Sequence, residues 1–340
     1  MRTSRSKPPT ADAPRRLLIL IGAPAGLRML GAWIDAGGNP VMFWREALVI
    51  AGVAVSMAGA LWWGVFHPTR RGVLLRTSRG VRQRLVYLTT LAGVLLLAGL
   101  LWAATRPAPG GDAAYMASDL VRLGLTTCAI WVLLAGVVVQ ASLLAPPRAW
   151  DVRRLSVREL NAILQLAMAA WLLLPTNPPA GTSATVAWLL PVQVLGVGLF
   201  IGQLALQVLR RPGVAVMVFA AVLFYHALAN FALVQFTAAT GLTAVVQFLA
   251  LAPAASLDAT YMMRLTDADS RVTFRYALVA SSVVTVGAAL FSLPQTPGFP
   301  PLSVASALLV VALGAPVGIG CGWSGATIGR AAIALATLAK

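Results

Sequence analysis

The sequence predicts an all-α protein, a polytopic transmembrane helix bundle of about ten spans with no soluble domain. Of its 340 residues, 59% are hydrophobic and only 11% are charged, whereas a soluble domain carries about 25% charged residues. Apolar runs long enough to cross a bilayer recur from one end of the chain to the other. Basic residues fall in alternate connections between these runs, as expected for cytoplasmic loops.

Ten apolar runs are the predicted helices: 17–33, 46–66, 85–104, 119–145, 159–175, 184–209, 213–235, 241–258, 276–293 and 302–320. Arg28 interrupts the first run, and the fifth is short. We expect a basic cytoplasmic arm at 1–16, a bundle at 17–320, and a short cytoplasmic tail or helix extension at 321–340. The first run also resembles a cleaved signal segment, but the loop charges favour a retained span.

Twenty-two of the 26 Lys and Arg residues lie in the terminal segments and in alternate connections. The connection 67–84 alone carries six arginines, whereas the connections 176–185 and 294–301 carry no basic residue. This pattern predicts an integral protein of the bacterial inner membrane with both termini in the cytoplasm. The net charge of +16 is therefore assigned to membrane orientation, and no nucleic-acid partner is expected.

Little of the chain can carry chemistry, since it has two histidines and ten acidic residues. We predict no metal and no cofactor. Asp258, near the inner end of its predicted helix, suits either a proton or ion relay or an interface pair with Arg264, and we favour the pair. An outer polar set could line an outward-facing site or form a solvated rim: Asp35, Arg45, Glu46, Arg106, Asp112, Asp119 and Arg122.

Two patterns within apolar runs indicate helix contacts. Gly314, Gly318 and Gly322 recur every four residues, and such a stripe allows another helix to approach closely. The stripe suits a ligand, a partner or a helix of the same chain. His226 and Asn230 are also four residues apart, so they share a helix face, and we expect His226 to be buried and hydrogen-bonded to a neighbouring span.

The "HALAN" segment, entered from the "RRPG" hairpin, resembles the HxxxN motif of the CPBP superfamily of CaaX-protease and bacteriocin-processing membrane proteins, also called Abi. The resemblance covers roughly residues 119–235 and implies glutamate-dependent proteolysis inside the membrane, with glutamates and histidines activating water. Where the family has EExxxR, this chain reads "VQASL", and where it has FxxxH, the chain reads "WLLLP". Glu159 is a possible displaced acid, but it is single.

Since the glutamate pair and the FxxxH motif are missing, we expect a non-catalytic membrane protein, a subunit or scaffold of a membrane complex. It would bind a partner membrane protein, a lipid or an apolar ligand. The alternatives are a peptidase of the CPBP type that uses His226, Asn230 and Glu159, or a small-molecule transporter.

Overall fold

A computed structural model describes residues 13–61, 83–84, 87, 90–91, 112–141, 143–144, 155–174, 182–233, 238–263, 270–296 and 299–338. Every regular element in these ranges is a helix, and no strand occurs in them. The all-α prediction is therefore confirmed.

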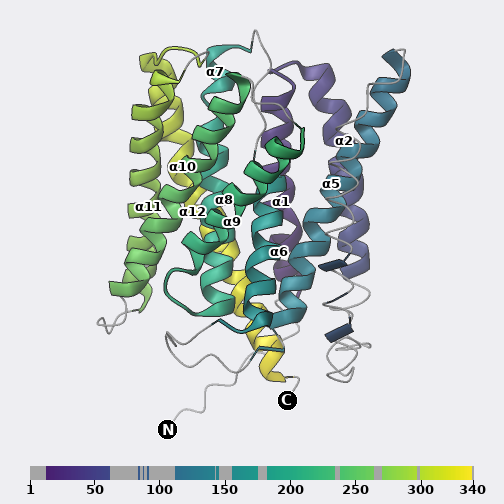
Figure 1. Cartoon of the computed structure of the whole chain (residues 1–340), viewed down its shortest axis with the longest axis vertical. Coiled ribbons are helices and arrows are strands. Elements are labelled where there is room, and N and C mark those ends of the chain that lie inside the picture. Colours follow the sequence, from purple (N-terminus) through teal and green to yellow (C-terminus); the bar gives the residue numbers. More distant parts are fainter. Residues whose placement is uncertain are drawn as a thin grey trace.

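Most of the long helices run along the bundle, and the start of α1 and the end of α12 lie at the same end, opposite α7 (Figure 1). In chain order they are α1 (Ala13–Asp35), α2 (Pro40–Leu61), α5 (Asp112–Ala141), α6 (Val157–Leu173), α7 (Ala184–Ala187), α8 (Leu190–Leu209), α9 (Val214–Leu233), α10 (Ala238–Met263), α11 (Ser270–Ser292), the short 3-10 helix η4 (Leu293–Gln295) and α12 (Val304–Leu338).

Nine of the ten predicted helix ranges coincide with a long helix in the described residues, and the tenth, 85–104, lies mostly outside them. The largest difference is in α12, which continues to Leu338 instead of ending at 320. No proline follows Pro316 within this helix to stop it, so the segment 321–338 extends the last helix.

Six helical segments are long and apolar enough to cross a membrane, judged by length and composition: Leu18–Asp35, Pro40–Gly59, Leu120–Ala141, Ala184–Leu209, Phe274–Gln295 and Val304–Ile333. Arg28 lies inside the first of them without ending the helix. In α9, Val214–Ala227 is a shorter apolar segment. Among the described residues the count of candidate spans is thus six, whereas the sequence predicts about ten across the whole chain.

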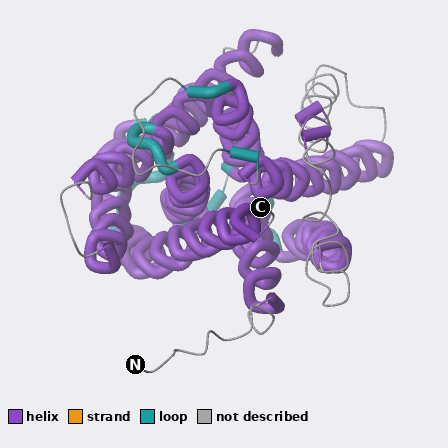
Figure 2. The backbone as a smooth tube through the Cα atoms, turned by 90° about the horizontal axis from the view of Figure 1, so that it is seen from below, coloured by secondary structure: helices purple, strands orange, loops and turns teal. Residues whose placement is uncertain are grey.

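The central helix of the bundle is α8, which contacts α1, α6, α9, α10, α11 and α12. All of its residues except Gln207 are buried. Glycines make this possible, because an added Cβ at Gly196 would lie 2.6 Å from Leu27 of α1, and one at Gly198 would overlap Pro253 of α10. Figure 2 views the bundle from the end that carries both termini, with many of the helices seen nearly end-on.

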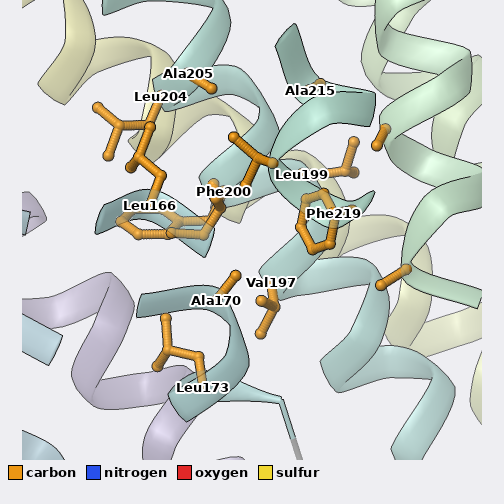
Figure 3. Close-up of a cluster of buried hydrophobic side chains, with 14 of the residues drawn as sticks. Leu166, Ala170, Leu173, Val197, Leu199, Phe200, Leu204, Ala205, Ala215 and Phe219 are labelled. Carbon is orange, nitrogen blue, oxygen red and sulfur yellow. The ribbon is translucent and has the colours of Figure 1, made fainter. Parts of the chain in front are cut away.

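A tight hairpin joins α8 to α9. Arg210 caps α8 in the left-handed region with φ of 50°, and Gly213 has φ of 80° just before α9 begins. The following helices then pack side by side, so that Phe200 of α8 lies among Leu166 and Ala170 of α6 and Phe219 of α9 (Figure 3). This core fixes α6, α8 and α9 relative to one another, and with them the residues considered next.

Candidate functional site

The histidine of the HxxxN pattern lies on α9 and is half-buried instead of fully buried as expected. It is twelve residues beyond Val214, so it lies about 18 Å along the helix axis from the hairpin. The preceding residue, Tyr225, donates a hydrogen bond to the Leu164 carbonyl of α6 at 3.3 Å. At this level, therefore, α9 faces α6. The backbone of Asn230 continues α9, and its side chain lies outside the described residues.

The carboxylate of Glu159 is engaged at the start of α6. Ser156 donates to Oε2 from its backbone N at 2.7 Å and from its hydroxyl at 2.8 Å. The Glu159 backbone N donates back to the Ser156 hydroxyl at 3.3 Å, which completes a capping box. The Arg211 guanidinium, from the α8–α9 hairpin, donates to Oε1 at 2.8 Å and to Oε2 at 3.2 Å. Glu159 therefore joins the first turn of α6 to the hairpin.

This environment also sets the protonation state of Glu159. Partial burial acts to raise the pKa of its carboxyl, but the hydrogen bonds from Ser156 and Arg211, together with the Arg211 charge, outweigh burial and lower the pKa. An ionised carboxylate with hydrogen bonds to both oxygens is a poor general base, which needs a free lone pair directed at its water. The structure holds Glu159 in a contact with the hairpin, while His226 lies three turns further along α9.

Asp258 on α10 caps the N-terminus of α9. Its carboxylate accepts hydrogen bonds from the backbone N of Val216 at 2.8 Å and of Ala215 at 3.5 Å. The first backbone N–H groups of a helix have no partner within the helix, and an acid there is also favoured by the helix dipole. The position of Asp258 thus has a structural explanation. Its expected pair with Arg264 stays a prediction, because Arg264 lies outside the described residues.

The glycine stripe of α12 faces helices of the same chain. An added Cβ at Gly314 would lie 3.1 Å from Val286 of α11, and one at Gly318 would lie 2.9 Å from the Ser282 hydroxyl of α11 and 3.0 Å from Leu195 of α8. At Gly322 it would overlap Leu278 of α11. The stripe is therefore covered by α8 and α11.

The outer polar set supplies partners to Arg28, the residue that interrupts the first apolar run. Asp35, at the end of α1, and Glu46 of α2 both interact electrostatically with the Arg28 guanidinium. Asp112, Asp119 and Arg122 lie on α5, and Arg45 lies beside Glu46 on α2, whereas Arg106 lies outside the described residues. The α1–α2 part of this set is thus more than a solvated rim, because it neutralises a charge within a candidate span.

A second polar group, which the sequence reasoning did not single out, lies between α5, α6 and the segment that includes Gln83 and Thr90. We call it the polar seam, and its members are Gln83, Tyr87, Thr90, Gln140, Arg158, Asn161 and Gln165. The Asn161 amide donates to Gln140 at 3.2 Å and to Thr90 at 3.1 Å, and the Gln165 amide donates to Thr90 at 2.5 Å. The sequence signal for the polar seam is a pair of amides four residues apart in an apolar run, as in "NAILQ".

In the described part of the chain, no group of three or more His, Cys, Asp or Glu side chains is arranged so that it could hold a metal ion. Both cysteines are free. Comparison with known proteins finds no matching family model, no similar curated protein and no similar solved structure. Membership of the CPBP superfamily therefore stays a prediction.

Proposed function

We propose that this chain is a non-catalytic polytopic protein of the bacterial inner membrane, a subunit or scaffold that binds a partner membrane protein through the outward face of α1. Ten spans and cytoplasmic termini belong to the same proposal. The concentration of arginine in alternate connections supports this orientation, as does the position of the start of α1 and the end of α12 at one end of the bundle (Figure 1).

The non-catalytic part of the proposal is supported by how the acids near the α8–α9 hairpin are used. Glu159, the acid that a CPBP-type peptidase would recruit, is bound by Ser156 and Arg211. Asp258 is bound by the first turn of α9. Each carboxylate joins two elements of the bundle, so its contribution is to assembly.

The observation that carries the partner proposal is a pair of uncovered glycines on α1. Gly22 and Gly26 are four residues apart and exposed, and an added Cβ at either would meet nothing within 4 Å in the described residues. In the described residues the chain fills its other four-residue glycine spacings, on α8 and α12, with its own helices. A GxxxG face that remains open suits the close approach of a helix from another membrane protein, whereas lipid tails gain little from glycine.

The test is whether the α1 face holds an assembly together. After extraction in mild detergent, the mass of the complex is measured by light scattering for the unmodified chain and for Gly22→Leu and Gly26→Leu. We expect both variants to lose mass relative to the unmodified chain. Gly287→Leu is the matched control, because Gly287 of α11 is also exposed with nothing within 4 Å of an added Cβ.

An unchanged mass in Gly22→Leu and Gly26→Leu would refute the role of this face. The non-catalytic part is tested separately, with purified protein and a peptide substrate panel. Peptidase activity that is lost in folded His226→Ala protein would overturn it and restore the CPBP alternative.

The transporter alternative is favoured by one specific observation. Pro24, Pro253 and Pro316 lie inside α1, α10 and α12, and each of these helices packs on α8. Interior prolines free backbone carbonyls and allow bending, as in the discontinuous helices of transporters. Uptake of a solute into vesicles containing the purified protein would favour this alternative over a scaffold.

A further inference from the structure

We propose that the polar seam is an aqueous crevice, open at the end of the bundle that carries the α8–α9 hairpin, which binds water at Gln165. The inference does not depend on the scaffold function, because it concerns a different face of the chain.

The seam runs inward along one face of α6. Arg158, Asn161 and Gln165 are spaced by three and four residues, so they lie on the same side of the helix. From the first to the last, the seam extends about 10 Å along the helix axis. Arg158 stands near the α6 N-terminus, where its guanidinium donates to the Leu143 carbonyl at 3.3 Å and to the Gln83 side chain at 3.5 Å.

The mouth of the seam lies at the surface of the bundle. Tyr87 is 60% exposed, and its hydroxyl accepts a hydrogen bond from the Gln83 amide at 3.0 Å. Beyond this mouth the hydrogen bonds continue without a break. The Gln140 amide donates to the Arg158 carbonyl, and its oxygen accepts from Asn161, which in turn contacts Thr90. The side chains thus form a continuous polar route from the mouth to Gln165.

The inner end of the seam has an unsatisfied atom. Gln165 is 2% exposed, its Nε2 donates to Thr90, and its Oε1 has no hydrogen-bond partner among the described residues. Exchanging the amide nitrogen and oxygen would leave the nitrogen unpaired instead. A buried amide atom without a partner destabilises the fold, and a water that also bonds to neighbouring polar groups removes that penalty. Thr90 and Asn161 are such neighbours.

The charges of the seam favour a neutral occupant. Its seven members include no carboxylate, so nothing within the seam balances a cation. Its one charged member, Arg158, stands at the mouth with its guanidinium held by Leu143 and Gln83. Glu159 is directed to Ser156 and Arg211. Amides and hydroxyls that both donate and accept suit water.

Cysteine accessibility tests the crevice. Cys128 and Cys321 are first replaced by alanine, and Gln165→Cys is then treated in native membrane vesicles with a membrane-impermeant methanethiosulfonate, applied from each side in turn. Leu166→Cys is the matched control, since Leu166 is the next residue at the same depth and is 0% exposed. Val157→Cys, at a residue 85% exposed near the mouth, reports which side the reagent reaches.

From the side that labels Val157→Cys, we expect Gln165→Cys to react at least about tenfold faster than Leu166→Cys, because only a hydrated thiol ionises. Equal, slow reaction at both positions would overturn the proposal. If Gln165→Cys does not fold, Asn161→Cys with Ala162→Cys as its buried control gives the same comparison. Labelling of Val157→Cys from the unexpected side would revise the orientation, while the ratio of rates would still decide the crevice.

Discussion

Adding a single methyl group to α12 has opposite consequences at two of its glycines. At Gly325 an added Cβ would overlap the backbone carbonyl oxygen of Phe200 in α8 and lie 3.0 Å from its carbonyl carbon. At Gly320, on the exposed face of the same helix, an added Cβ would meet nothing within 4 Å. The pair Gly325→Ala and Gly320→Ala therefore isolates the α8–α12 contact from the helix preference of alanine.

The magnitude follows from two terms. Replacing a helical glycine by alanine stabilises a helix by about 0.5–1 kcal/mol, and both variants share this gain. Overpacking in a well-packed contact costs about 1–3 kcal/mol, and Gly325→Ala falls at the upper end because a main-chain carbonyl cannot rotate away as a side chain can. We therefore expect Gly325→Ala to be less stable than Gly320→Ala by about 3 kcal/mol.

The assay is thermal unfolding of the purified protein in mild detergent, followed by tryptophan fluorescence. Gly320→Ala should unfold at or above the temperature of the unmodified chain, and Gly325→Ala several degrees below it. Equal unfolding temperatures in the two variants would refute the close approach of α8 and α12 at this point.

Three further predictions concern the hairpin and the topology. The pKa of Glu159 is lower in the folded protein than its ordinary value of 4.5, so the ionised carboxylate stabilises the fold above pH 4.5. This stabilisation is lost as the pH falls through the folded pKa. Thermal unfolding of Glu159→Gln should therefore depend less on pH in that acidic range than thermal unfolding of the unmodified chain. Asp258→Ala should lower the free energy of unfolding by about 1–3 kcal/mol, and Asp258→Asn by less because an amide oxygen still accepts from α9, so equal losses would argue against capping. A cysteine placed at Arg76 should resist an impermeant reagent added outside cells and one at Pro179 should react, and the reverse result would contradict the proposed orientation.

The positions of the helices can be predicted because their apolar runs are long. The contacts that polar side chains make with other helices cannot be predicted in this way. The capping box of α6 can be read in the sequence as Ser156 followed by Glu159, since that motif is local. Arg211, which completes the site of Glu159, is 52 residues further along the chain. The sequence marks Asp258 as an unusual acid, but the α9 backbone groups that donate to it depend on which helix ends meet. Polar side chains in apolar runs can be found from sequence alone, but the helix that each one faces is fixed by tertiary packing.

The contacts within the polar seam likewise cannot be predicted from the sequence. Asn161 and Gln165 are visible as amides within an apolar run, and their spacing places them on one face. Their shared contact with Thr90 joins residues about seventy positions apart, and no periodicity reports such a pairing. Conversely, the four-residue glycine spacing on α12 indicated close packing, although only the structure identifies α8 and α11 as the helices packed against it.

The burial of α8 has a consequence for biogenesis. Translation delivers α8 to the bilayer before two of the helices that cover it, because α10 and α12 are synthesised later. Until α10 arrives with Tyr261, whose hydroxyl donates to the Gln203 amide oxygen at 3.1 Å, that amide faces hydrocarbon or an insertion factor. Until α12 arrives, Phe200 lacks the helix that closes over its backbone. A chain that stops before Val304 would therefore leave the α12-facing side of its innermost helix uncovered, which would make it a substrate for membrane quality-control proteases.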